Sequence, residues 1–315
     1  MLDCVTIGET MVAFSSKENE PIRYATTFEK YLAGAESNLA VGLAKLNKKA
    51  GWISKTGDDE FGEFILRELR AENVDVSQVI KCKTNPTGIM FKQCITGQET
   101  KVLYYRENSA ATTLAKHEIP LDYIKSAKIL HITGITPAIS PTAKEMVIEA
   151  VTFARNSGMQ ISFDPNIRLK LWSKQEAKKF LTKLLPLSSI VLIGDEEAEI
   201  LLDTKEPKEV ERKLRDLGVK KIALKLNSKG AYVADETDSY FIPPIETKVV
   251  DSVGAGDAFG AGFLCGILEN EPIERCGKMG ALMGALAVST QSDTVRLSSR
   301  EIFDNMLNNK KEIYR

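Results

Sequence analysis

Residues 251–257, with the sequence DSVGAGD, have the composition of an anion-binding turn that begins a helix. Free backbone N–H groups at a helix start, together with the helix dipole, attract anions. Gly254 and Gly256 would let the backbone approach a phosphate closely. Asp257 would repel that phosphate unless it collects a proton, so it is expected to be the general base for a hydroxyl that attacks phosphorus.

Other interpretations of this turn are excluded or stay open. A dinucleotide-binding fold needs G-x-G-x-x-G after an early strand, but Phe259 occupies the third glycine position and the segment lies near the end of the chain. The chain has no G-x-x-x-x-G-K-[ST] motif, which excludes a P-loop enzyme. From these residues alone, Asp257 as a simple helix cap remains an alternative.

Strands and helices alternate in the chain that leads to this turn. Apolar strands near residues 128–132, 160–164, 190–193 and 221–226 are separated by amphipathic helices. This alternation predicts an α/β fold, a doubly wound and mostly parallel sheet with helices on both faces.

The earlier strands do not fit this alternation. We expect strands from about residues 11–31 and 87–107 to project from the sheet edge as a small β lid, with 88–95 and 101–106 forming a hairpin. No linker or repeat interrupts the chain, which favours a single domain over residues 1–315. Because an exposed lid face and its edges usually need cover, a homo-oligomer joined through the lids is expected.

The composition of the whole chain favours work on small molecules. The 42 Lys and Arg residues balance 43 Asp and Glu residues, so no net field would recruit nucleic acid or a membrane. Five scattered cysteines and two histidines, without a C-x-x-C pair, argue against a zinc site or disulfide framework. We find neither a signal-peptide pattern nor an apolar stretch that would span a bilayer, so the cytoplasm is the expected compartment.

Two motifs resemble those of a known family. Residues 33–40 (AGAESNLA) and 251–257 match, in order and approximate separation, the ribokinase-like (PfkB-type) carbohydrate kinases, and the resemblance covers nearly the whole chain. It implies a Rossmann-like domain with a β lid, a Mg²⁺–ATP cofactor and phosphorylation of a primary hydroxyl. The implied residues are Asp257 as the base, Gly254, Ala255 and Gly256 as the anion hole, and Gly34 and Asn38 for substrate hydroxyls. The alternative for residues 33–40 is a turn with a helix cap.

Further segments resemble the 2-keto-3-deoxygluconate kinases within that family. The implied substrate contacts are Tyr104, Arg106, Arg168 and Asp293. Guanidinium groups bind a carboxylate through paired hydrogen bonds, so two arginines suit a sugar acid, whereas a neutral ketose would not require them. For either arginine alone, a surface or ion-pair role is an equal alternative.

The resemblance also implies a nucleotide side to the site. Its residues are Asn166, Lys225, Asn227 and Gly230 for ATP, with Glu197 ordering magnesium through water. Four residues depart from the family pattern: Gly194 replaces the Asn of an N-x-x-E motif, Met90 replaces a tyrosine, and Glu107 and Asn108 replace Lys-Gly. These departures bear on the substrate and the metal contact, and they leave the kinase chemistry intact.

The leading prediction is therefore ATP-dependent phosphorylation of the 6-hydroxyl of 2-keto-3-deoxygluconate. A fructokinase or ribokinase-type enzyme of a neutral sugar is the alternative. A non-catalytic sugar-binding protein is less favoured, because a mere binder has no use for a base that faces phosphate. The sequence leaves dependence on a monovalent cation open.

Overall fold

The main sheet contains nine strands within the part of the chain that the structure describes. In this computed structural model that part comprises residues 1–16, 20–93, 101–289, 294, 297 and 299–308. The strand order is β13-β12-β11-β10-β9-β8-β1-β4-β5, and the pairs are parallel except for β11–β12 and β12–β13. The bounds are β1 (Leu2–Ile7), β4 (Ala50–Gly57), β5 (Val79–Cys82), β8 (Ala127–Thr133), β9 (Gln160–Asp164), β10 (Ile190–Gly194), β11 (Lys221–Lys225), β12 (Ala231–Ala234) and β13 (Ser239–Ile242).

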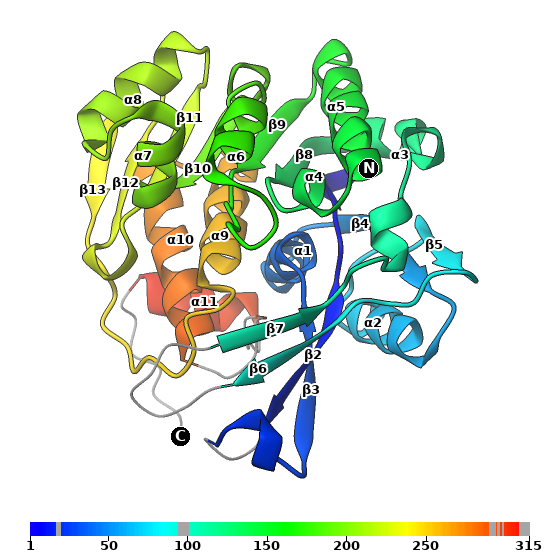
Figure 1. Cartoon of the computed structure of the whole chain (residues 1–315). Helices are drawn as coiled ribbons and strands as arrows, with labels where there is room; N and C mark the ends of the chain where they lie inside the picture. Colours follow the sequence, from blue (N-terminus) through cyan, green and yellow to red (C-terminus); the bar gives the residue numbers. More distant parts are fainter. Residues whose placement is uncertain (17–19, 94–100, 290–293, 295–296, 298, 309–315) are drawn as a thin grey trace.

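Two layers of helices cover the sheet (Figure 1). Leu192 of β10 packs in one hydrophobic cluster, and its neighbours Val191 and Ile193 pack in the other, so this strand is apolar throughout. One layer consists of α1 (Ala35–Lys45), α2 (Glu60–Ala71), α9 (Ala255–Leu268), α10 (Ile273–Val288) and α11 (Arg300–Leu307). The other consists of α3 (Leu121–Lys125), α4 (Thr136–Ile139), α5 (Pro141–Asn156), α6 (Lys174–Leu181), α7 (Asp195–Leu202) and α8 (Pro207–Asp216). The predicted α/β class, with a mostly parallel sheet, is confirmed.

Helix α9 packs closely between α1 and α10. A Cβ atom at Gly262 would lie 2.4 Å from the carbonyl oxygen of Met279 in α10. One at Gly42 in α1 would lie 2.6 Å from the Cβ atom of Ala261. Glycine at these positions therefore lets the helix backbones approach each other, which explains the Gly- and Ala-rich sequence of α9.

A second sheet, with four strands among the residues that the structure describes, forms the lid below the main sheet in Figure 1. Its order is β3-β2-β6-β7, with β2 and β6 parallel and the two outer pairs antiparallel. The bounds are β2 (Met11–Ser16), β3 (Phe28–Ala33), β6 (Ile89–Gln93) and β7 (Lys101–Tyr105). The predicted pairing of β6 with β7 is confirmed, whereas β3 extends two residues beyond the predicted lid boundary at residue 31.

The sequence patterns missed several short or peripheral elements. Strand β5 has only four residues, all incompletely buried, so it shows no clear period. Helices α3, α4 and α11 were also not predicted; α11 is capped by the preceding Ser299, whose hydroxyl accepts a hydrogen bond from the N–H of Ile302. No helix among the described residues is long and apolar enough to cross a membrane.

Candidate active site

Asp257 lies in the first turn of α9, directly after the glycine turn. Gly254 caps this helix with φ of 83°, a left-handed conformation that favours glycine. The Nδ2 atom of Asn38 in α1 donates a hydrogen bond to Oδ2 of Asp257 over 2.9 Å. A Cβ atom at Gly256 would lie 3.6 Å from the ammonium nitrogen of Lys225. A carboxylate, an amide and a cation thus meet beside the backbone of the turn.

The surroundings of Asp257 raise the pKa of its carboxyl group to about 7. Burial is the largest cause, because it disfavours the charged form. The hydrogen bond from Asn38 and the positive charges of Arg168 and Lys225 lower the pKa, whereas the negative charge of Asp164 raises it. A carboxyl group with a pKa near neutrality can accept a proton at pH 7 and retain it during a reaction.

Asn38 also presents an acceptor that no described residue uses. Its side chain is buried, and its Oδ1 atom has no hydrogen-bond partner among the described residues. A buried polar atom of this kind suits a donor from a ligand, such as a sugar hydroxyl. Gly34, which precedes α1, has a packing reason of its own: a Cβ atom there would lie 2.6 Å from the carbonyl oxygen of Glu9 and from the hydroxyl of Thr10. Substrate contacts by Gly34 and Asn38 stay predictions.

The last residues of β9 and β11 form an ion pair close to the turn. The Nζ atom of Lys225 lies 2.5 Å from Oδ2 of Asp164. Asn166 follows β9 with φ of 35°, and its N–H donates to Oδ1 of Asp164 over 3.2 Å. Parallel strands bring their carboxyl ends to one edge of the sheet, where α/β proteins bind ligands. Asn166 and Lys225 therefore lie where a nucleotide contact is expected.

Two backbone amides hold Glu197 at the start of α7. Its Oε1 atom accepts the N–H of Ile167 over 2.8 Å, and its Oε2 atom accepts the N–H of Gly194 over 2.7 Å. Burial and the nearby charge of Asp164 raise the pKa of Glu197. No group of three His, Cys, Asp or Glu side chains in the described ranges forms a set of metal ligands. Two neighbouring carboxyl groups still fit magnesium, which usually keeps several waters and binds one or two carboxylates together with phosphate oxygens.

The turn that holds the predicted ATP contacts Asn227 and Gly230 has a clear structural basis. Asn227 is exposed and has φ of 53°, and its Nδ2 atom lies 3.4 Å from Oδ1 of Asp195. Gly230 has φ of 101°, and a Cβ atom there would lie 2.2 Å from the carbonyl oxygen of Ile242. Glycine is therefore required at this position whether or not ATP is bound, and contact of this turn with ATP stays a prediction.

Arg106, at the end of the lid hairpin, is bound by a buried carboxylate. Its Nε and Nη2 atoms donate to Oε2 of Glu9 over 2.8 and 2.5 Å. The hydroxyl of Ser109 donates to Oε1 of Glu9 over 2.5 Å. Tyr104 lies nearby, with its ring centroid 5.7 Å from the guanidinium carbon of Arg106. Binding of a substrate carboxylate by the remaining N–H groups of Arg106 stays a prediction.

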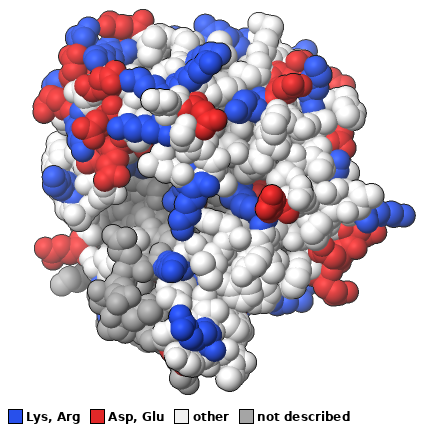
Figure 2. Space-filling model, in the orientation of Figure 1, with Lys and Arg blue, Asp and Glu red and all other residues white. Residues whose placement is uncertain are grey.

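Arg168 lies on the loop that follows β9 and is exposed. The same loop reaches the lid, because the Nζ atom of Lys170 donates to the carbonyl oxygen of Val102 over 3.1 Å. Figure 2 shows basic side chains gathered in the middle of this face, above the lid strands. The loop thus brings positive charge between the lid and α9. The remaining predicted substrate contact, Asp293, lies outside the described residues.

Sequence reasoning missed two buried glutamates beside the site. Glu9 follows β1 and binds Arg106, as described above. Glu36 lies in α1, 1% exposed, and its Oε1 atom accepts the hydroxyls of Thr133 and Thr136 over 2.7 and 2.6 Å. Burial raises the pKa of Glu36. For Glu36 the sequence signal was one charged residue within an otherwise uncharged motif, which does not reveal partners about 100 residues away.

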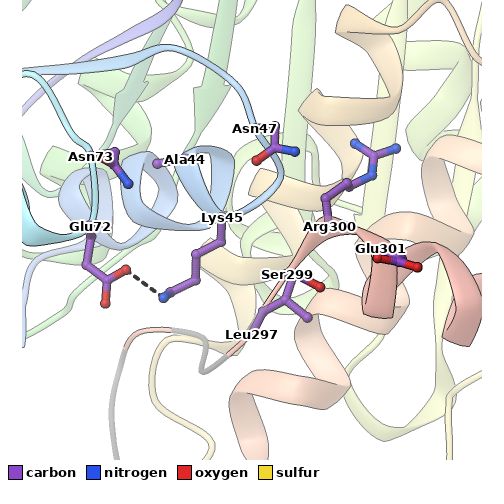
Figure 3. A pocket seen from close by; sticks show the side chains of 9 residues that line it. All are labelled: Ala44, Lys45, Asn47, Glu72, Asn73, Leu297, Ser299, Arg300 and Glu301. Atoms are coloured by element: carbon purple, nitrogen blue, oxygen red, sulfur yellow. Dashed lines mark hydrogen bonds and ion pairs between the residues drawn. The ribbon is translucent and has the colours of Figure 1, made fainter.

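A separate surface pocket lies at the opposite end of α1 from Asn38 (Figure 3). Lys45 and Glu72 form an ion pair at its edge, with N and O atoms 2.6 Å apart. Arg300 of α11 lines the other side. None of the predicted catalytic or substrate residues lines this pocket, so it is not part of the candidate site.

Comparison with known proteins places the chain in a family. Residues 1–300 match the family described as pfkB family carbohydrate kinase. The chain belongs to the pfkB family of carbohydrate kinases. The resemblance inferred from residues 33–40 and 251–257 is therefore confirmed.

Individual pfkB relatives match over nearly the whole chain. The 2-dehydro-3-deoxygluconokinase of Bacillus subtilis (strain 168) is 40% identical over 99% of this chain and 98% of its own length. The 5-dehydro-2-deoxygluconokinase of Clostridium tetani is 33% identical over 99% of this chain and 94% of its own length. A crystal structure of a PfkB protein from Polaromonas sp. JS666 is 34% identical, with a TM-score of 0.89, and covers 96% of this chain and 99% of that chain. The fold of this chain is thus the ribokinase-like fold of pfkB kinases.

Proposed function

We propose that the chain is an ATP-dependent kinase of 2-keto-3-deoxygluconate, also called 2-dehydro-3-deoxygluconate, and that it phosphorylates the 6-hydroxyl. Membership of the pfkB family supports the kinase activity, and the 40% identity to the Bacillus subtilis enzyme supports the substrate. The observation that carries the chemistry is the carboxyl group of Asp257, with a pKa raised to about 7, beside the glycine turn and in contact with Asn38.

In the proposed reaction, Asp257 accepts the proton of the primary hydroxyl while that oxygen bonds to the γ-phosphorus of ATP. The bond from the γ-phosphorus to the bridging oxygen breaks, and ADP leaves. Backbone N–H groups of residues 254–256 stabilise the negative charge of the transferred group. The N–H of Ala255 makes only a long contact of 3.4 Å with the carbonyl oxygen of Ser252, so it is available to phosphate.

ATP and Mg²⁺ are the proposed cofactors. The proposed nucleotide contacts are Asn166, Lys225, Asn227 and Gly230. Glu197 and Asp164 would hold magnesium through water, and the ion would neutralise charge on the phosphates. A monovalent cation is kept as a third candidate; rates in potassium, sodium and tetramethylammonium salts of equal ionic strength would decide whether one is required.

Recognition of the sugar acid is assigned to the lid and the loop after β9. Arg106 and Arg168 are the proposed partners of the substrate carboxylate, with Tyr104 beside them, because each guanidinium retains N–H donors. Gly34 and Asn38 are proposed to contact hydroxyl groups. Asp293 is kept as a further proposed substrate contact.

A second candidate substrate is 5-dehydro-2-deoxygluconate, because the Clostridium tetani relative carries that activity in its name. It is also a keto-deoxy sugar acid, so the same arginines would serve. We would measure ADP release with both acids and with fructose and ribose. Activity on either neutral sugar, with none on the two acids, would overturn the substrate proposal in favour of a neutral-sugar kinase.

Replacement of Asp257 tests the chemistry directly. We expect Asp257→Asn to bind ATP normally and to lose about 10²- to 10⁴-fold in kcat, as is typical when a general base is removed. Asp216→Asn, which alters an exposed carboxylate on α8, is the matched control and should retain full activity. Near-normal turnover of Asp257→Asn would mean that another group accepts the proton.

We further propose that residues 1–315 act as one kinase domain in the cytoplasm. Continuous alternation of elements through the main sheet, and the family match over residues 1–300, support the single domain. We also propose a homo-oligomer joined through the lids. The supporting feature is the aromatic outer face of the lid sheet, where Tyr105 is exposed.

A further inference from the structure

A buried ion pair joins the lid to the glycine turn. The Nζ atom of Lys92, in lid strand β6, lies 2.9 Å from Oδ2 of Asp251. The two side chains are only 1% and 4% exposed. Charges are seldom buried unless they are paired, because desolvation disfavours them. The pair therefore ties two segments that are 159 residues apart in the sequence.

Asp251 in turn shapes the segment that leads to the catalytic residue. Its Oδ1 atom accepts the N–H of Val253 over 3.1 Å, which folds the chain toward Gly254. The backbone N–H of Val250 donates to the carbonyl oxygen of Val288, at the end of α10, over 2.7 Å. The turn is thus fixed by α10 on one side and by the lid on the other, and the carboxylate of Asp251 makes the second connection.

The same face of the lid carries residues on the sugar side of the site. Side chains alternate along a strand, so Met90 and Lys92 point to the same face of β6. Met90 pairs with Tyr104 of β7, and Tyr104 lies beside the guanidinium of Arg106. One short strand therefore contacts the sugar-side residues and, two residues later, the turn that is proposed to bind phosphate.

We propose that Lys92 is a positioning residue, which sets the anion-binding turn for phosphoryl transfer through Asp251 when the lid is in place. This inference deepens the proposed kinase function and rests on it. Loss of the ammonium group would leave Asp251 as a buried, unpaired carboxylate, which would turn away or become protonated. The backbone N–H groups of residues 254–256 would then lose their fixed direction, and a mobile donor stabilises a transition state less well than a fixed one.

The test compares Lys92→Met with Lys92→Arg and with Lys101→Met, a control that alters an exposed lysine of the same lid sheet. We expect Lys92→Met to lower kcat about tenfold or more, with the KM for the sugar acid changed less than about threefold. We also expect the amides of residues 251–257 to exchange hydrogen faster than in the unmodified protein. The exchange rates in the rest of α9 and in β10 should stay unchanged. Lys92→Arg should restore most of kcat and of the protection, and Lys101→Met should match the unmodified protein.

Two results would overturn the inference. One is unchanged exchange of residues 251–257 in Lys92→Met together with normal kcat. The other is faster exchange throughout the chain, which would show that the pair only stabilises the fold. If Lys92→Met does not fold, we would make the same measurements on the double variant Lys92→Met with Asp251→Asn, which removes both charges. The same two results would overturn the inference.

The exchange measurement also separates this inference from the proposed function. If Asp257→Asn turned over normally, the proposed base would be rejected. Local exchange in Lys92→Met would still report whether the lid fixes the turn.

Discussion

Asp257 is held in surroundings that oppose its charge, and this has consequences for stability as well as for catalysis. Folding raises the pKa of this carboxyl group from 3.8 to about 7. A raised pKa means that the folded state favours the protonated form. The folded protein therefore loses stability, relative to a permanently neutral side chain, as the pH rises from about 4 through about 7.

A first prediction concerns this loss of stability. We expect Asp257→Asn to unfold at a higher denaturant concentration than the unmodified protein at about pH 8, with a gain of about 1–3 kcal/mol in the free energy of unfolding. The gain should shrink as the pH falls and disappear below about pH 3, where the aspartate is mostly neutral in both states, and at about pH 4 only a small part of it should remain. Chemical denaturation at the two pH values measures it. A variant that is equally stable or less stable at the higher pH would contradict the raised pKa.

A second prediction concerns activity. Because the base must be ionised to accept a proton, kcat/KM should fall about tenfold for each pH unit below about 7 and reach a plateau above it. The residual activity of Asp257→Asn should not show this acid limb. Initial rates between about pH 5 and pH 9, with a check that each enzyme stays folded, would measure both profiles. A flat profile for the unmodified enzyme across that range would exclude a base with this pKa.

At the scale of elements, the ends of β1 and β7 are joined by Glu9 and Arg106. The sequence predicted that Arg106 binds the carboxylate of the substrate. In the structure Arg106 is paired with a carboxylate of the protein itself, that of Glu9. Glu9 and Arg106 are 97 residues apart, and no local pattern reports such a pairing. Glu107, the family departure next to Arg106, is exposed.

A third prediction follows from this pair. Replacing Glu9 by Gln leaves a guanidinium that is only 11% exposed without its counter-charge, so we expect a loss of about 3 kcal/mol in the free energy of unfolding. Because Arg106 would lose the group that orients it, KM for the sugar acid should rise about tenfold. Denaturation and steady-state assays measure the two effects. Glu107→Gln is the control and should change neither the free energy of unfolding nor KM. An unchanged KM in Glu9→Gln would show that Arg106 does not contribute to substrate binding.

Local periodicity of apolar residues was sufficient to predict the bounds of elements whose buried faces are regular. Strand β9 begins and ends at the predicted residues, because its apolar residues are bounded by clear turn signals. Strand β5 and helix α11 were missed, because short, half-buried edge elements resemble surface loops in sequence. In the site, motifs predicted Asn38 and Asp257, but their hydrogen bond to each other and the Lys92–Asp251 pair arise from tertiary packing over 219 and 159 residues.

At the scale of the whole molecule, the outer face of the lid is apolar. Phe14 and Phe91 stack there with ring centroids 5.3 Å apart, and Tyr105 meets Phe91 edge-on. Tyr105 is 62% exposed and Leu103 is 38% exposed. Exposed aromatic faces of this kind commonly mark protein interfaces.

A fourth prediction tests the proposed oligomer. We expect the unmodified protein to sediment as a homo-oligomer, and the double variant Leu103→Ser with Tyr105→Ser to dissociate at micromolar concentration, because the apolar face would lose its largest exposed side chains. Phe241→Ser, at an exposed position on the far edge strand β13, is the control. A monomeric unmodified protein, or a double variant that stays assembled, would reject the lid interface.

Helix α9 packs closely against α1 and α10 at several glycines, and at Gly262 its backbone directly faces the backbone of α10, which leaves little room for this helix to slide. The sugar-side residues Tyr104 and Arg106, in contrast, belong to a separate small sheet. Under the proposed function, mutations at Tyr104 or Arg106 would alter which acid is accepted, whereas mutations at Lys92, which is paired with Asp251, would alter the phosphate-binding turn. Related kinases with this arrangement could change their substrate specificity while they retain the same phosphoryl-transfer chemistry.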